Sequence, residues 1–238
     1  MTTALELQGV HAGYGRIEVL HGVDLQVPSG SVVALLGPNG VGKTTTLRAI
    51  AGSLPVSSGS IRLRGRRIDN RRPSAIASRG LVLVPEGRGV FPALSVHDNL
   101  RVAHHGAQRS LVEPWDDWLA SIVATFPRLG ERLEQRAGSL SGGEQQMLAV
   151  CRALVGSPEV VMFDELSMGL APLVVAELFE RVAALRDAGR TIVMVEQYLT
   201  YALGLADICY VLAKGRVVWA GEPSELRSSR SAAVHLGA

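Results

Sequence analysis

The sequence predicts an α/β fold built on a mostly parallel sheet, and three observations support this prediction. Residues 37–45 form a glycine-rich loop between an apolar run and a helix-like segment. Short apolar strands alternate with helical patterns near both ends of the chain. The 238 residues are enough for one such domain with a smaller subdomain, but too few for two complete domains of this kind.

Composition sets few limits on function. The net charge of +2 and the isoelectric point near 8.7 are only weak evidence for nucleic acid or a membrane surface as partner. Cys151 and Cys209 match no metal or redox spacing, so we expect buried thiols in a reducing compartment. The start shows no secretory signal, and no apolar run reaches the roughly 20 residues that a membrane span needs.

The first part of the chain predicts strands ahead of the glycine-rich loop. Residues 5–10 and 19–27 show mixed alternation, with Gly13, Gly15 and Gly22 as turn residues. These two runs predict antiparallel strands, with Tyr14 in the first turn. Residues 31–36 then read as a buried strand, and 44–51 as a helix that ends at Gly52.

A basic stretch follows a short predicted strand over residues 61–63. Such a run is more often a solvated sheet edge than a contact to phosphate or lipid, and we favour the edge. Residues 81–84 read as a buried strand that breaks at Pro85. Glu86 should therefore lie at the carboxyl end of a strand, which faces the ligand in open α/β sheets. The arginines of the basic stretch are Arg62, Arg64, Arg66, Arg67, Arg71 and Arg72.

The pattern becomes helical between residues 96 and 155, which indicates a helical insertion. Helices are predicted near 96–103, 115–126 and 144–155. Trp115 and Trp118 are three residues apart, a spacing that favours a face packed on the core over a partner contact. The α/β pattern then resumes with strands at 160–163, 191–195, 208–212 and 217–219, and with helices over 172–187 and from Tyr198. We expect one domain, with an α/β core over 1–90 and 156–238 and a helical subdomain over 91–155.

The glycine-rich loop has the G-x-x-x-x-G-K-[ST] pattern of a phosphate loop that holds a nucleoside triphosphate. Its backbone N–H groups can turn toward phosphate oxygens, Lys43 can neutralise β/γ charge, and the Thr44 hydroxyl can take a Mg²⁺ position. A chance glycine-rich turn before a lysine is the alternative, but the strand before it and the helix after it favour the functional interpretation. The predicted contact residues are Gly37, Pro38, Asn39, Gly40, Val41, Gly42, Lys43, Thr44 and Thr45.

Two adjacent carboxylates end the predicted strand at 160–163. Asp164 can hold Mg²⁺ through water, while Glu165 can polarise an attacking water. Thr44, Glu86 and Asp164 are therefore our candidate metal residues. Tyr14, on a glycine-flanked loop, is either a plain turn residue or a ring that stacks on a nucleobase.

A Ser-Gly-Gly turn opens the helix near residue 144. Residues Ser141, Gly142, Gly143 and Glu144 can form a second anion site from free N–H groups and a hydroxyl. The alternative is that Ser141 is merely a helix N-cap.

Three motifs together, the phosphate loop, Leu-Ser-Gly-Gly-Glu-Gln at 140–145 and Val-Met-Phe-Asp-Glu at 161–165, resemble the ATP-binding cassette (ABC) ATPases over nearly the whole chain. The resemblance implies a RecA-like P-loop NTPase core with an antiparallel β subdomain and an inserted helical subdomain. It also implies a head-to-tail dimer, with ATP held between the phosphate loop of one subunit and residues 141–143 of the other. Tyr14 matches the aromatic residue that stacks on adenine in this family.

Several positions depart from the common family pattern. Glu86 replaces the usual Gln after the strand at 81–84, and Gln197 replaces the usual His that contacts the γ-phosphate. Gln can donate a hydrogen bond but cannot carry positive charge. Leu166 stands where a proline is common, and Ala171 where an aspartate is common. With Glu165 as base, hydrolysis should survive the change at Gln197, whereas the changes at 166 and 171 concern the coupling across the dimer.

The departures are similar to one subgroup, the second (F) ATPase subunit of high-affinity branched-chain amino acid importers. Segments 84–92, 126–129, 141–149, 169–172 and 195–197 carry this similarity. It implies two membrane-spanning permease subunits, a second ABC ATPase in a heterodimer or a second copy in a homodimer, and a periplasmic substrate-binding protein. It also implies a place at the cytoplasmic face of the cell membrane. Importers of urea and short amides share much of this pattern.

Two other classes of function remain as alternatives. A soluble ABC ATPase acting on DNA or the ribosome would usually resemble two fused cassettes or carry long coiled coils, and this chain has neither, so we expect no nucleic acid. A nucleotide-sensing subunit with little turnover is suggested by Gln197 and Ala171, but Glu165 argues against it.

Overall fold

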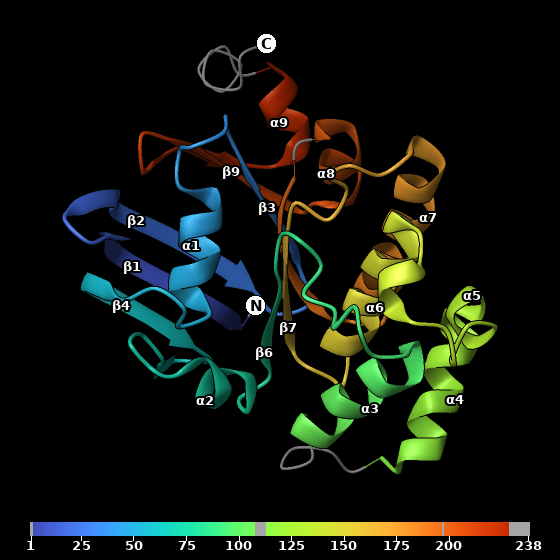
Figure 1. The fold of residues 1–238 in the computed structure, drawn as a ribbon. Helices are drawn as coiled ribbons and strands as arrows, with labels where there is room; N and C mark the ends of the chain where they lie inside the picture. Colours follow the sequence, from blue (N-terminus) through green and yellow to red (C-terminus); the bar gives the residue numbers. More distant parts are fainter. Residues whose placement is uncertain (1, 108–112, 197, 229–238) are drawn as a thin grey trace.

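The computed structural model describes residues 2–107, 113–196 and 198–228. Two β-sheets and the helices packed against them make up this part of the chain (Figure 1). The α/β fold class and the mostly parallel main sheet predicted from the sequence are confirmed.

The first sheet is antiparallel and has the strand order β2-β1-β4-β5. Strand β1 keeps Leu5 and Leu7 buried before a register shift, and Val10 and Ala12 after it. Gly9, with a φ of +53°, lies at this irregularity, which is a β-bulge. The bulge explains the mixed alternation in the sequence, because one extra residue moves the buried positions from odd to even. The strands are β1 (Thr3–Tyr14), β2 (Ile17–Pro28), β4 (Val56–Leu63) and β5 (Arg66–Arg67).

The second sheet has the order β10-β9-β3-β8-β7-β6, with only β10 running antiparallel to its neighbour. All residues of β3, β7 and β8 are buried. Both faces of a parallel sheet are covered, which is why these strands read as continuous apolar runs. The strands are β3 (Val32–Leu36), β6 (Leu81–Val84), β7 (Val160–Asp164), β8 (Thr191–Val195), β9 (Ile208–Ala213) and β10 (Arg216–Gly221).

The parallel sheet separates two hydrophobic clusters. Along β3, Val33 and Leu35 pack with helix α1 (Lys43–Ile50) and the antiparallel sheet. Val32 and Ala34 face the opposite cluster, with α6 (Gly142–Ala153) and α7 (Pro172–Asp187). Helix α1 therefore lies between the two sheets (Figure 1).

The helices between β6 and β7 gather at one side of the parallel sheet (Figure 1). Trp118 is buried and Trp115 packs against the same cluster, so the expected core role of both is confirmed. His104 lies against both rings at centroid distances of 5.3 and 5.5 Å. These elements are α3 (Val96–Ala107), α4 (Trp115–Thr125), α5 (Pro127–Gly130), the 3₁₀ turn Ala137–Ser139 and α6.

The remaining helices are short, and several elements differ from their predicted extents. α2 (Pro73–Ala77), α8 (Leu199–Leu205) and α9 (Pro223–Ser228) complete the fold. Strands β1, β2 and β4 are longer than predicted, because hydrogen bonds to neighbouring strands extend them through glycines and polar residues. No helix in the described part of the chain has both the length and the apolar character needed to span a membrane.

Candidate active site

The phosphate loop joins β3 to α1 and depends on glycine at several positions. Gly37, Gly40 and Gly42 have φ values of +142°, +80° and +109°. A Cβ on Gly37 would lie 2.4 Å from the Leu212 carbonyl oxygen, and one on Gly42 would lie 2.8 Å from Leu20 Cδ2. Gly42 is also the N-cap of α1, and it offers no side-chain cap. The loop therefore presents backbone N–H groups at the positive end of a helix, which is an arrangement suited to a phosphate.

Lys43 lies inside this loop with only 5% of its surface exposed. Its Nζ donates hydrogen bonds to the carbonyl oxygens of Gly37 at 2.7 Å and Pro38 at 2.9 Å. Burial lowers the pKa of its ammonium group, while Glu165 and Asp164 oppose that shift. The carbonyl groups of the phosphate loop thus hold the Lys43 ammonium group within the loop.

Thr44 and Asp164 meet at the end of β7. Thr44 Oγ1 donates to Asp164 Oδ1 at 2.9 Å. Burial raises the pKa of Asp164, and the nearby carboxylates of Glu165 and Glu86 raise it further, against the Thr44 hydrogen bond and the charge of Arg48. A hydroxyl and carboxylates in one place are the hard oxygen ligands that Mg²⁺ prefers, usually one or two from the protein together with phosphate and water oxygens. These residues fit a magnesium ion.

Glu165 follows directly and has an unusual backbone. Its φ is +50°, a left-handed conformation that is rare for a residue with a Cβ. Its N–H donates to the Val195 carbonyl at 2.9 Å, which ties it to the end of β8. Such conformations cluster at functional sites, where the surrounding structure enforces them.

A cleft of about 470 Å³ brings many of the predicted residues together. Tyr14 lies at its edge, 43% exposed, and its hydroxyl accepts a hydrogen bond from Arg48 Nη1 at 3.1 Å. Tyr14 ends β1 and pairs with Ile17, so the turn itself is formed by the two residues after Tyr14. Val19 and Met168 also line the cleft, although the sequence analysis did not single them out. The predicted residues that line it are Tyr14, Asn39, Gly40, Gly42, Lys43, Thr44, Thr45, Glu86 and Glu165.

Residues 141–144 lie at the start of α6 and are absent from the lining of this cleft. Ser141 caps the helix, and its hydroxyl accepts from the Glu144 N–H at 3.3 Å. The Glu144 carboxylate accepts in return from the Ser141 N–H at 2.9 Å, which completes a capping box. A Cβ on Gly143 would lie 2.2 Å from Val174 Cγ1, so close packing against α7 requires glycine there.

The loop after β6 connects the cleft to α6. Glu86 lines the cleft, and Arg88, two residues later, donates from Nη1 to Gln145 Oε1 at 2.6 Å. At the other end of α6, Arg152 donates to the Gly89 carbonyl and lies over the Phe91 ring. The sequence analysis missed these contacts, because nothing in the sequence spacing pairs residue 88 with residue 145.

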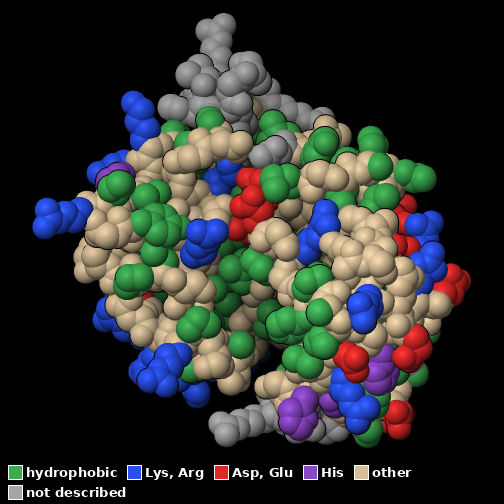
Figure 2. Space-filling view, viewed as in Figure 1, with side chains coloured by type: hydrophobic (Ala, Val, Ile, Leu, Met, Phe, Trp, Pro, Cys, Tyr) green, Lys and Arg blue, Asp and Glu red, His purple; other side chains and the backbone are tan. Residues whose placement is uncertain are grey.

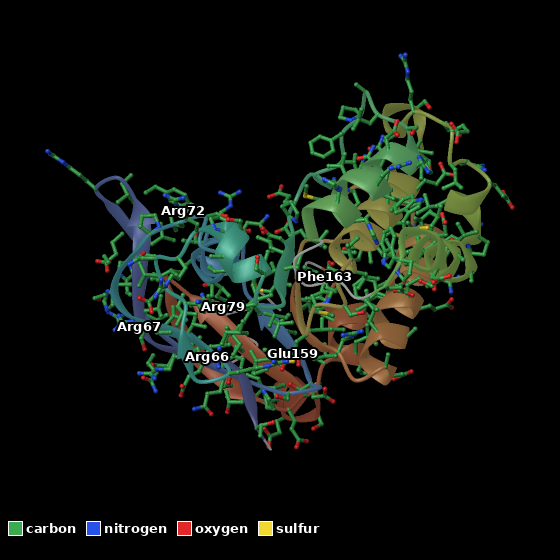
Figure 3. The ribbon with its side chains drawn as sticks, turned by 90° about the horizontal axis from the view of Figure 1, so that it is seen from below. Arg66, Arg67, Arg72, Arg79, Glu159 and Phe163 are labelled. Atoms are coloured by element: carbon green, nitrogen blue, oxygen red, sulfur yellow. The ribbon has the colours of Figure 1, made fainter. Side chains whose placement is uncertain are left out.

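Several other predicted features can also be placed. Acidic side chains gather near the centre of the face shown in Figure 2, beside basic ones. The arginines of the basic stretch lie around β4, β5 and α2, and Figure 3 labels Arg66, Arg67 and Arg72 among them. Arg64 pairs with Glu159, and Arg67 pairs with Asp69. Both cysteines are free and buried, and burial raises the pKa of Cys209 to about 11. Gln197 lies outside the described residues.

Comparison with protein families decides which class of nucleotide-binding protein this is. The family model described as ABC transporter matches residues 20–167, which include the phosphate loop, the 141–144 turn and the carboxylate pair. The chain belongs to the ABC transporter family. It is an ATP-binding cassette that binds and hydrolyses ATP.

Individual relatives are similar over most of their length. The chain is 42% identical to the high-affinity branched-chain amino acid transport ATP-binding protein BraG of Pseudomonas aeruginosa, over 90% of this chain and 91% of that protein. It is 37% identical to the probable branched-chain amino acid transport ATP-binding protein LivF of Archaeoglobus fulgidus, over 91% of each. The fold matches a nucleotide-free ATP-binding cassette from an ABC transporter with a TM-score of 0.87, over 99% of both chains at 23% identity.

Proposed function

We propose that this chain is the ATPase subunit that powers the import of branched-chain amino acids across the cell membrane. The observation that carries the proposal is the likeness to BraG, which extends over nine-tenths of both chains. The likeness to LivF points to the same class of solute. The phosphate loop, the 141–144 turn and the carboxylate pair support the role of a subunit that hydrolyses ATP to drive transport.

The ATP site is completed by a second subunit. Residues 141–144 do not line the cleft of the phosphate loop, so one chain supplies two separate halves of a site. A head-to-tail pair brings Ser141, Gly142 and Gly143 of one subunit onto the nucleotide held by the other. The capped α6 N-terminus directs its N–H groups toward that phosphate. The partner is a second ABC ATPase or another copy of this chain.

Each residue at the cleft takes a separate role. Tyr14 stacks on the adenine, residues 37–45 surround the phosphates, and Lys43 neutralises β- and γ-phosphate charge. Thr44, Asp164 and Glu86 would hold Mg²⁺. When bound, the ion offsets negative charge on the triphosphate.

Glu165 is the general base. Its carboxylate takes a proton from a water molecule as the water oxygen attacks the γ-phosphorus. The bond from that phosphorus to the β–γ bridging oxygen breaks, and ADP and phosphate leave. Gln197 donates a hydrogen bond to the γ-phosphate, which stabilises its charge without supplying a cation.

The partners follow from this role. Two membrane-spanning permease subunits bind the ATPase pair at the cytoplasmic face of the membrane, and a periplasmic binding protein delivers the solute to them. The division of the chain into a core (1–90 and 156–238) and a helical subdomain (91–155) lets the loop with Glu86 and Arg88 convert ATP binding into movement of α6.

Co-purification and uptake test the proposal together. We expect the tagged chain, expressed at its natural level and extracted in mild detergent, to bring down two multi-span proteins and a second cassette ATPase. Vesicles that carry that complex, with ATP inside and its binding protein outside, should take up radiolabelled leucine, and Lys43→Ala should abolish uptake. Uptake of urea or acetamide in place of leucine, or isolation of the chain with ribosomes or nucleic acid, would contradict the proposal.

A further inference from the structure

A buried carboxylate joins the turn after β7 to the end of β8. Ser167 and Glu196 are only 1% and 3% exposed. The Ser167 N–H donates to Glu196 Oε1 at 3.2 Å, and the Ser167 hydroxyl donates to Glu196 Oε2. Two donors from one residue therefore meet the two oxygens of one carboxylate. Nothing in the proposed hydrolysis uses this acid directly.

The position of the pair relates it to Glu165. Along the chain, Ser167 is two residues after Glu165, and Glu196 directly follows Val195. Val195 already accepts the Glu165 N–H and pairs with Asp164 in the sheet. The Val195 carbonyl thus holds the backbone of Glu165 at its own N–H. The side chain of Glu196, which follows Val195, holds the same turn at Ser167.

This attachment explains how the chain keeps Glu165 in its left-handed conformation. A φ of +50° costs free energy for a non-glycine residue and persists only where neighbouring contacts enforce it. A buried carboxylate is itself costly unless it accepts hydrogen bonds, so Glu196 and Ser167 strongly favour contact with each other. The geometry of the turn is therefore set by a polar contact rather than by apolar packing alone.

We propose that Ser167 and Glu196 are positioning residues for ATP hydrolysis, which hold the turn so that the Glu165 carboxylate points into the cleft. The inference rests on the role of Glu165 in the proposed function. Within one subunit, the pair joins the turn that carries Glu165 to the residue that follows β8.

The experiment compares Ser167→Ala, Glu196→Gln and the double variant in the assembled transporter. Each single variant removes a hydrogen bond or a charge with little change of volume. We expect kcat for ATP hydrolysis to fall about tenfold or more, because a small misplacement of a catalytic group has a large effect on rate. The KM for ATP should change less than about twofold, because the phosphate loop remains intact. The double variant should be no slower than the slower single variant, because both changes break the same contact.

Thr191→Val is the matched control. Thr191 begins the same strand β8, is 1% exposed, and accepts the Gly30 N–H at 2.9 Å through its hydroxyl. This variant should lower the melting temperature through loss of a buried hydrogen bond while kcat stays at the wild-type value. A loss of stability alone would thereby be separated from a loss of positioning.

Three results would overturn the inference: an unchanged kcat in Ser167→Ala, a double variant slowed by the product of the two single effects, or a kcat loss in Thr191→Val as large as in Ser167→Ala. Glu165→Gln, measured beside them, separates this failure from that of the proposed function. If Glu165→Gln abolishes turnover while Ser167→Ala does not alter it, only the positioning role fails. If Glu165→Gln turns over normally, the assigned base is wrong as well.

Discussion

Lys43 and Asp164 are buried ionisable side chains, and burial disfavours the charged form of each. Burial lowers the pKa of Lys43 and raises that of Asp164. Each would be costly in isolation, but here backbone carbonyls receive the ammonium group and the Thr44 hydroxyl donates to the carboxylate. The loop and the end of β7 thus keep both buried polar groups hydrogen-bonded.

Thr44→Val tests the metal position. The change keeps the shape of the side chain but removes the hydroxyl that contacts Asp164. We expect ATP hydrolysis to fall at least about tenfold, a loss of 1.4 kcal/mol or more in transition-state stabilisation, and the Mg²⁺ concentration for half-maximal activity to rise. A magnesium titration of phosphate release measures both quantities.

Thr46→Val is the control for that experiment. Its hydroxyl lies on the same helix and is more deeply buried than that of Thr44, but it donates to the Gly42 carbonyl rather than to Asp164. The magnesium requirement should stay at the wild-type value. An equal shift in the two variants would show that the hydroxyl at Thr44 has no special role.

At this scale the sequence suggests which residues to propose for the chemistry, but it does not reveal the contacts that position them. The motifs identified Lys43, Thr44 and Glu165 because their spacing is local. Ser167 and Glu196 lie 29 residues apart, and their contact arises only because β7 and β8 are neighbours in the sheet. The position of Arg48 near Thr44 could have been predicted, because it lies four residues after Thr44 on the same face of one helix.

At the scale of elements, α6 shows that a turn proposed to contact nucleotide also stabilises a helix. The sequence analysis placed the start of this helix near Glu144, whereas α6 begins at Gly142 with Ser141 as its cap. The capping box explains the difference, because it fixes the first turn through two side chains rather than through apolar periodicity. The two interpretations weighed for Ser141, anion site and N-cap, are therefore compatible in one residue.

Glu144→Gln tests the contribution of the cap through its pH dependence. Burial acts to raise the pKa of Glu144, but hydrogen bonds from Ser141 and the charge of Arg132 outweigh it, so the pKa lies below the ordinary 4.5. The stability that its charge contributes is therefore present above pH 4.5 and is lost as pH falls through the lowered pKa. At pH 7 the variant should be less stable by roughly 0.3–1 kcal/mol, the usual size of such a helix-terminus charge.

Urea unfolding at several pH values measures this difference. The gap between wild type and Glu144→Gln should close as the solution is acidified through the titration of Glu144. Glu180→Gln, which changes an exposed carboxylate in α7, should show no such gap at neutral pH. A constant gap at every pH would mean that the amide, rather than the missing charge, causes the loss.

For the whole molecule, the parallel sheet between two hydrophobic clusters organises the cleft. The phosphate loop follows β3, and the carboxylate pair ends β7, so both lie at the carboxyl end of one sheet. The sequence predicted this arrangement because buried strands and their polar ends are local patterns. It could not predict which strands are neighbours, nor that the loop after β6 attaches to α6, because these depend on packing between distant segments.

The central claim is that ATP bound at this cleft is hydrolysed with Glu165 as the base, and that this drives transport. The most direct test is single-site phosphate release in the assembled transporter, with the other ATPase site disabled. The wild-type chain should release phosphate, while Glu165→Gln should bind ATP with unchanged affinity and release almost none. Phosphate release at the wild-type rate from Glu165→Gln would contradict the account.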